Sequence, residues 1–355
     1  MSERMAPAGA RLAAMFTLLG TRSAPPAAAA PAAPKAAAVP ADPKAAAAPA
    51  DTEGTREAYE RGDCDAALPG LEAEVARQPQ RALAHYQLGF CLDRGGHKER
   101  ALEHKKRAAA LFEIEAASGK GWEPYYYLAA LSGLDLQDPA AARTYAQEGM
   151  RRLPAPASLD GVACFQASRL AGFAEMEQEK VLWMSRAAER FAAQKSPPVV
   201  YAVEALLSAG DHALQAGENE KARDWLERVA QLSPVVHEAW LAAGVARLRL
   251  GDAAGALADF RRVTAEPIRT EAQYAVRTLE RAGDVSKLPD RLPDGRLISA
   301  LEGEEQRAAL RSGCGGEWKE ASQPAALALL VARLRRGEFL RESAIAAGCL
   351  ELLFR

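Results

Sequence analysis

A spacing of thirty-four residues recurs in this chain of 355 residues. Between residues 203 and 270, a later copy repeats the small and large residues of an earlier copy at this interval. The equivalent pairs are Gly210 and Gly244, Gly217 and Gly251, Ala222 and Ala256, and Leu226 and Phe260. Upstream, Gly62 and Ala67 recur as Gly96 and Ala101. A repeat of this length predicts an array of similar units, each of which buries its apolar face only against a neighbour.

The spacing and its residue types resemble the tetratricopeptide repeat family. The residues that carry the resemblance are Trp240, Leu88, Gly89, Ala256, Phe260 and Pro234, in the family's Trp, Leu-Gly, Ala, Phe and Pro positions. The resemblance covers about residues 50–155 and 203–270, and it implies an all-α fold, a right-handed α-solenoid of helix-turn-helix repeats. Because this family is a scaffold for many different partners, the resemblance says little about a specific function.

The residues also make physical sense as paired helices. An aromatic content of only 6%, with Ala supplying much of the apolar content, favours closely packed helices over strands. Small residues at the helix contacts allow close approach, and large residues fill the space around them. Glycines are expected where a first helix ends in a left-handed residue, and aspartates as N-caps of the second helix. These are Gly62, Gly96, Gly217 and Gly251, and Asp63 and Asp252.

Three regions are predicted along the chain. Residues 1–50 form a disordered N-terminal peptide and Ala/Pro-rich linker, because recurring prolines block a continuous helix and nothing there can be buried. Residues 51–283 form the repeat array, with an irregular hairpin at 156–202. Residues 284–355 form a C-terminal capping region with helices near 298–312, 324–336 and 338–354. The wide apolar face of the last helix predicts either packing back on the array or a homodimer through this helix.

The N-terminal tip leaves two interpretations open. The stretch RLAAMFTLLGTR has about nine mildly apolar residues between Arg11 and Arg22, too few for a membrane span. It fits either a weak signal peptide within residues 1–28 or a short docking peptide on a tether. We predict a cytoplasmic protein, with a periplasmic or exported protein as the alternative.

Charge and cysteine content narrow the function classes. A net charge of −2 gives no reason to expect nucleic acid or an acidic membrane as a partner. The five cysteines form no Cys-x-x-Cys motif, so no zinc ribbon or redox motif is present. We interpret them as free thiols in a reducing compartment, in keeping with a cytoplasmic protein.

No catalytic, cofactor or metal site is predicted. The five histidines show no metal-ligand spacing, and His85 occupies a repeat position where other copies carry Trp240 or Tyr125, so we expect a partly buried core histidine. Cys314 lies in the Gly-rich stretch SGCGGEW, which lacks the Lys-Ser/Thr of a phosphate loop. As a nucleophile Cys314 would need a histidine base, and no histidine follows residue 237. We therefore predict that the protein is not an enzyme.

The first helix of each unit should line the concave side of the array. From the repeat register, we expect an apolar partner-binding groove that contains Tyr86, Phe90, Tyr126, Ala130, Leu207, Asp211, Leu241 and Val245. Its apolar and aromatic character is unlike that of tetratricopeptide proteins that hold a C-terminal carboxylate with Lys and Asn. Such a groove suits a helix or an extended peptide. The alternative is that these residues pack against the chain's own N-terminal segment or last helix.

Within this groove we predict an aromatic hot spot at Tyr126, Tyr86 and Phe90. On this hypothesis Tyr126→Ala weakens partner binding by more than about 1 kcal/mol and leaves the fold intact. The predicted function is a non-catalytic adaptor or scaffold for protein partners of unknown identity. The alternatives are an exported envelope protein that assists assembly of a secretion or pilus-like machine, and an enzyme with its site in residues 285–355.

Overall fold

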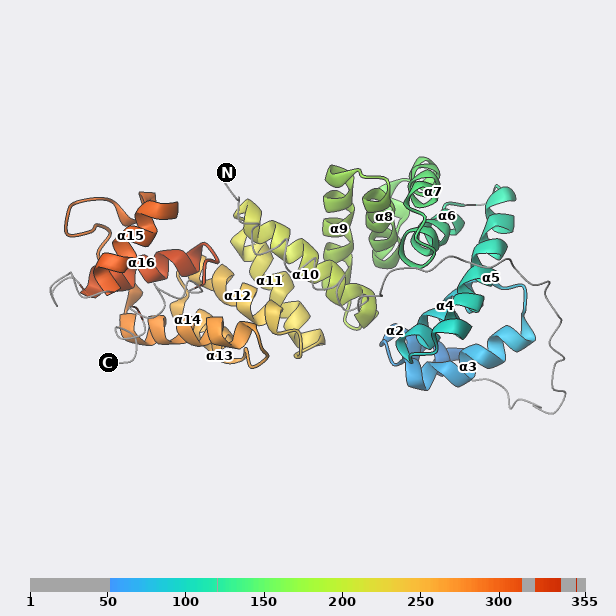
Figure 1. The fold of residues 1–355 in the computed structure, drawn as a ribbon, viewed down its shortest axis with the longest axis horizontal. Helices are drawn as coiled ribbons and strands as arrows, with labels where there is room; N and C mark the ends of the chain where they lie inside the picture. Colours follow the sequence, from blue (N-terminus) through green and yellow to red (C-terminus); the bar gives the residue numbers. More distant parts are fainter. Residues whose placement is uncertain (1–51, 120, 315–322, 340–348, 350–355) are drawn as a thin grey trace, which may run out of the picture. The chain divides into compact units, whose positions relative to one another are not determined.

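The computed structural model describes residues 52–119, 121–314, 323–339 and 349. As far as residue 282, helices follow one another with short connections (Figure 1). The helix pairs are α2 (Thr52–Glu60) with α3 (Cys64–Arg77), α4 (Ala82–Arg94) with α5 (Lys98–Ala117), α6 (Glu123–Ala130) with α7 (Pro139–Arg152), α8 (Gly161–Phe173) with α9 (Glu177–Ala192), α10 (Val199–Ala216) with α11 (Asn219–Leu232), and α12 (His237–Arg249) with α13 (Ala253–Arg261). In the described residues the β-contact is an isolated bridge between Arg291 and Leu297. The predicted all-α class is confirmed.

The helices group into two units, which we describe separately. The first unit holds the described residues up to 202, and the second unit those from 203 onward, with the division inside α10. The second unit continues after α13 with α14 (Ile268–Ala282), α15 (Gly303–Cys314) and α16 (Gln323–Arg335). The predicted helix at 298–312 begins later, at Gly303, because Leu301 is extended with ψ 126°. The helix predicted at 338–354 lies largely outside the described residues.

The turns within four of these helix pairs have the predicted chemistry, whereas those of α6–α7 and α8–α9 have Gln137 and Glu175 at positive φ. Gly62, Gly96, Gly217 and Gly251 have φ of 78°, 81°, 80° and 86°. This left-handed conformation suits glycine because it has no Cβ. The carboxylates of Asp63 and Asp252 accept hydrogen bonds from the backbone N–H groups of Ala66 and Gly255 and cap the following helices. Local sequence therefore specifies the hairpin turns.

Glycines on the first helices allow the close helix contacts. A Cβ built at Gly244 would lie 2.5 Å from Phe260 Cε1, and one at Gly210 would lie 2.9 Å from Leu226 Cγ. A Cβ built at Gly89 would lie 2.9 Å from Lys105 Cγ. Lys105 occupies the repeat position that holds Phe260 or Leu226 in the other copies. The Lys105 ammonium compensates for its burial with two ion pairs, because Nζ lies 2.6 Å from both Asp93 and Asp135.

Gly244→Ala is expected to destabilise the protein by about 2 kcal/mol, because the methyl group overlaps the buried Phe260 ring and overpacking has this cost. Gly172→Ala is the matched control. Gly172 is exposed on α8, and its nearest neighbour is the flexible Lys180 side chain at 3.5 Å. There, alanine should stabilise by up to about 1 kcal/mol through helix propensity. Urea unfolding of both variants checks the pair, and a similar effect of the two substitutions would contradict the packing argument.

The cysteines correct one prediction. Cys64 is bonded to Cys91 and Cys314 to Cys349, so the expectation of free thiols is wrong for four of the five, and Cys164 is the free one. The paired residues are 27 and 35 positions apart. Such separations form no local motif, and the sulfur atoms meet only because the helices pack.

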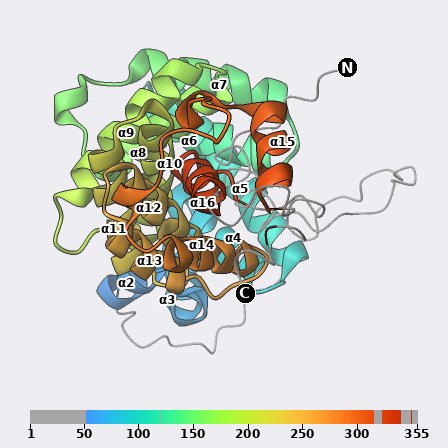
Figure 2. The same ribbon diagram turned by 90° about the vertical axis from the view of Figure 1, so that its left-hand side faces the viewer.

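The last helix described in the second unit, α16, packs onto the two earlier helices α12 and α14. α16 contacts α12 and α14, and it lies beside α14 in both views (Figures 1 and 2). Arg249 of α12 donates hydrogen bonds to the carbonyl oxygen of Leu214, near the end of α10, and to that of Arg335, at the end of α16. One guanidinium therefore joins the C-terminal ends of two helices to α12, where the helix dipoles favour a cation.

Candidate functional site

Five tyrosines on first helices of the first unit make up an aromatic surface, which we call the tyrosine face. They are Tyr59 of α2, Tyr86 of α4, Tyr126 and Tyr127 of α6, and Tyr201 of α10. Tyr127 is central, because its ring centroid lies 4.9 Å from that of Tyr86 and 5.0 Å from that of Tyr126, both in edge-on contacts. On its other side Phe112 stacks on Tyr127 at 4.6 Å. These are favourable aromatic geometries that hold the rings in place.

The hydroxyl groups of the tyrosine face are close to one another. Burial raises the pKa of Tyr59 and of Tyr86, and the neighbouring tyrosines raise both further because their phenolate charges would repel. Tyr59 and Tyr201 are hydrogen-bonded to each other, and Gln166 Nε2 donates to Tyr127 Oη at 3.4 Å. The phenols therefore stay protonated and remain able to donate hydrogen bonds.

The two ends of the tyrosine face meet. A Cβ at Gly62, after α2, would lie 3.2 Å from Val200 Cγ2 at the start of α10. Tyr59 lies near the end of α2 and Tyr201 near the start of α10, close in sequence to these two contacting residues. The helix pairs of the first unit thus curl until α2 reaches α10, and the aromatic rings line the enclosed side. Tyr59 and Tyr126 are only 9% and 7% exposed, whereas Tyr86, Tyr127 and Tyr201 are partly exposed.

The structure brings together part of the predicted groove. Tyr86 and Tyr126 both contact Tyr127. Phe90 lies 5.8 Å from Tyr59 in an edge-on contact. Tyr59 and Tyr201 were not among the groove residues predicted from the sequence. Both lie on the first helix of a pair, the position from which the other groove residues were predicted. Because Tyr126 is buried, Tyr126→Ala would also leave a cavity, so Tyr86 is the better residue to replace.

In the second unit, the predicted groove residues offer little exposed surface. Leu207, Asp211 and Val245 are buried, with Val245 only 2% exposed. Leu241 is partly exposed and packs, with Trp240, on the core formed by Val263, Ile268 and Ala272. Asp211 accepts a hydrogen bond from Gln215 at 2.7 Å. Ala130, in the first unit, is also buried. We therefore place the candidate site on the tyrosine face.

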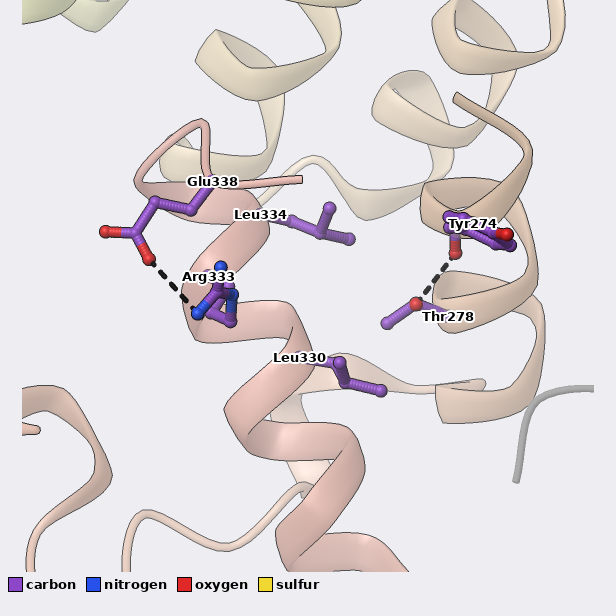
Figure 3. Close-up of a pocket in the computed structure, with 6 residues that line it drawn as sticks. All are labelled: Tyr274, Thr278, Leu330, Arg333, Leu334 and Glu338. Atoms are coloured by element: carbon purple, nitrogen blue, oxygen red, sulfur yellow. Dashed lines mark hydrogen bonds and ion pairs between the residues drawn. The ribbon is translucent and has the colours of Figure 1, made fainter. Parts of the chain in front are cut away.

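A small pocket lies between α14 and α16 of the second unit (Figure 3). Its lining residues are Tyr274, Thr278, Leu330, Arg333, Leu334 and Glu338. Thr278 Oγ1 donates to the Tyr274 carbonyl oxygen, and Arg333 pairs with Glu338 at 3.8 Å. The free volume of about 10 Å³ is roughly what one water molecule needs, so the pocket is a packing defect rather than a ligand site.

In two places a thirty-four-residue spacing carries the left-handed turn glycine from one helix pair to the next, from Gly62 to Gly96 and from Gly217 to Gly251. Glycines on first helices of the pairs contact a leucine or an aromatic ring of the second helix, as Gly210 and Gly244 do. The chain folds into helix pairs that resemble tetratricopeptide repeats. No protein-family model and no curated protein matches it. The resemblance rests on the chain's own helix pairs.

Three solved structures are similar to this repeat protein at low identity. A chain of the APC/C hetero-tetramer Cut9–Hcn1 is 15% identical with a TM-score of 0.43, over 61% of this chain and 40% of that one. YrrB, a TPR protein with an unusual peptide-binding site, is 16% identical with a TM-score of 0.35, over 58% and 96%. The TPR domain of P58(IPK) is 14% identical with a TM-score of 0.28, over 85% and 96%. The match thus spans less than half of the Cut9–Hcn1 chain.

In the described part of the chain, no three His, Cys, Asp or Glu side chains gather as a metal ion would require. Among the same residues, no helix combines the length and apolar character needed to cross a bilayer.

His85 is a buried core histidine and forms a pair with His104. Their Nδ1 atoms lie 3.0 Å apart, and His85 Nε2 lies 3.2 Å from the Pro79 carbonyl oxygen. Because a carbonyl only accepts, His85 Nε2 carries the hydrogen, and His85 Nδ1 accepts from His104 Nδ1–H. The contact excludes two charged rings, because both Nδ1 atoms would then carry hydrogens. Burial lowers the pKa of both rings and favours their neutral forms.

The histidine pair predicts a pH dependence. Both histidines have a lower pKa in the folded protein than in the unfolded chain, where it is about 6.5. Their contribution to the free energy of unfolding is therefore fully present above about pH 6.5 and is lost as the pH falls through the folded-state pKa. His104→Gln keeps an N–H donor that cannot be protonated. Between pH 7 and pH 5 the free energy of unfolding should fall less steeply in this variant than in the unmodified protein. Equal slopes in urea unfolding would show that the pair does not titrate as described.

Proposed function

We propose that the protein is a non-catalytic scaffold that binds a polypeptide segment of a partner protein on the tyrosine face. The observation that carries the proposal is the convergence of five tyrosines from α2, α4, α6 and α10, three of them partly exposed. Tyrosine supplies large, rigid contact area and a hydroxyl donor, and it is enriched among the residues that dominate interface energies. The disulfide of Cys314, the thiol considered as a nucleophile, supports a non-catalytic role.

Tyr86→Ala is expected to weaken binding of a partner by more than about 1 kcal/mol, because the partly exposed ring is a contact that alanine cannot replace. Tyr145→Ala is the matched control, since Tyr145 is also partly exposed but lies on the second helix α7. A partner recovered with the unmodified protein is titrated against both variants by calorimetry, with circular dichroism to verify folding. Equal affinity of the folded Tyr86→Ala variant would place the binding surface elsewhere.

A second candidate is an exported envelope protein that assists assembly of a secretion or pilus-like machine. The two disulfides favour export, because disulfides form and persist mainly in oxidising compartments. The signal-peptide interpretation concerns residues 1–28, which lie outside the described residues. N-terminal sequencing of the mature protein tests it. A start near Ala27 would support export, whereas a start at Met1, Met5 or Met15 would support the cytoplasmic adaptor.

A further inference from the structure

The chain carries a candidate ligand for its own tyrosine face in the Ala/Pro-rich stretch at residues 24–50. We propose that this stretch binds the tyrosine face as an extended proline-rich segment and competes there with the partner. The inference rests on the proposed function, because it concerns the same surface. It adds the class of ligand, a proline-rich extended peptide, and a form of regulation, occupation of the site by the chain itself.

The chemistry of the face matches that of proline-rich segments. Proline has no N–H group, so such a segment offers mainly carbonyl acceptors and flat pyrrolidine rings. The tyrosine face offers the complementary groups, hydroxyl donors and aromatic rings, with Tyr86, Tyr127 and Tyr201 partly exposed. Aromatic-lined surfaces bind proline-rich peptides in this way because the polyproline conformation exists before binding and loses little entropy.

The connection of the segment to the face makes binding within one chain favourable. The segment ends at Ala50, and α2, which carries Tyr59, begins at Thr52. At about 3.1 Å per residue, ten residues of polyproline conformation span about 30 Å, more than the length of α2. A tether this short gives an effective concentration in the millimolar range. At this effective concentration, a contact with a dissociation constant of about 1 mM is already formed in a large fraction of the molecules.

The charges of the segment complement those beside the face. Lys35 and Lys44 are the basic residues of the stretch. Carboxylates lie close to the face, since Glu60 follows Tyr59 on α2 and Glu123 lies one turn before Tyr127 on α6. After the larger effect of burial, Glu60 raises the pKa of Tyr201 and Glu123 that of Tyr127. Phe90 contacts Tyr59, and the Arg94 guanidinium lies 5.7 Å from the centre of the Phe90 ring. The acidic border favours a weakly basic ligand and gives the interaction a dependence on salt.

The experiment uses the full chain and a labelled peptide of residues 24–50. In a second full chain, serine replaces the seven prolines of the stretch, which are Pro25, Pro26, Pro31, Pro34, Pro40, Pro43 and Pro49. We expect the peptide to bind the serine chain at least about tenfold more tightly than the unmodified chain, because the tethered segment competes only in the latter. Fluorescence anisotropy gives both affinities. The same peptide with the seven serines is the matched control and should not bind.

Tyr86→Phe in the serine chain removes one hydroxyl and keeps the ring, so the fold is preserved and peptide affinity should fall severalfold. The inference is overturned if the peptide binds neither chain, binds both equally, or is indifferent to Tyr86→Phe. It is also overturned if only proline-rich peptides from other proteins bind. A different result contradicts the proposed function, namely an unchanged affinity of the Tyr86→Ala variant for the partner protein. If Tyr86→Ala loses the partner but the serine chain binds that partner no better than the unmodified chain, the proposed function stands and this inference falls.

Discussion

Replacing Arg247 with methionine is expected to destabilise the protein by about 3 kcal/mol, because it leaves a buried carboxylate without its cation. The Arg247 guanidinium contacts three carboxylates, Glu227 at 2.6 Å, Asp252 at 2.7 Å and Asp259 at 2.9 Å. Asp259 is only 4% exposed, so water cannot take over the role of the guanidinium. Urea unfolding of the variant gives the loss directly.

Arg261→Met is the control for this result. Arg261 pairs with Glu280 at 2.8 Å, but its side chain is mostly exposed, and exposed pairs contribute at most about 1 kcal/mol. If Arg247→Met and Arg261→Met cost the same, the buried cluster does not depend on its cation.

The loss in Arg247→Met should also depend on pH. Burial raises the pKa of Asp259 to about 6, more than the neighbouring Arg247 lowers it. Because this folded pKa exceeds the unfolded value near 4, the contribution of Asp259 is fully present below about pH 4 and is lost as the pH rises through about 6. Without Arg247 the charged form becomes still less favourable. The variant should therefore lose more stability at pH 7.5 than at pH 4.5.

Removal of the disulfide between Cys64 and Cys91 is expected to lower the free energy of unfolding by about 3–4 kcal/mol, from the entropy that the closed loop removes from the unfolded chain. The bond lies in the core of the first unit beside Leu71 and Leu88, and Cys91 is 0% exposed. The double variant Cys64→Ala, Cys91→Ala avoids a buried hydroxyl. Urea unfolding with and without a reducing agent measures the effect, and reduction should destabilise the unmodified protein but affect the double variant less.

Cys164→Ala is the matched control, because Cys164 is buried but unpaired. It removes one sulfur atom and no cross-link, so its stability should remain as sensitive to reduction as that of the unmodified protein. Thiol titration of the native protein provides a direct count. One reactive thiol after denaturation without reductant agrees with two disulfides, and five would contradict them.

Most of the local architecture could be predicted from sequence. The left-handed turn at Gly251 and the N-cap at Asp252 depend on residues a few positions apart, so their signals are contained in a short window. The contact of Gly244 with Phe260 follows equally from the repeat register. The candidate site was only partly predictable. Tyr86 and Tyr126 follow from the register of the first helices, but their contact through Tyr127 depends on how neighbouring pairs pack.

The amino-acid sequence by itself determined the helix pairs, their turns and their order, because these depend on spacing and on the backbone preferences of single residues. Only the tertiary structure decided which distant residues meet. The curl of the first unit brings Tyr59 to Tyr201, and helix packing brings Cys64 to Cys91 and Cys314 to Cys349. A small rotation between successive helix pairs accumulates along a repeat array, so contacts between distant repeats are set by the sum of many packing interfaces and by no short stretch of sequence.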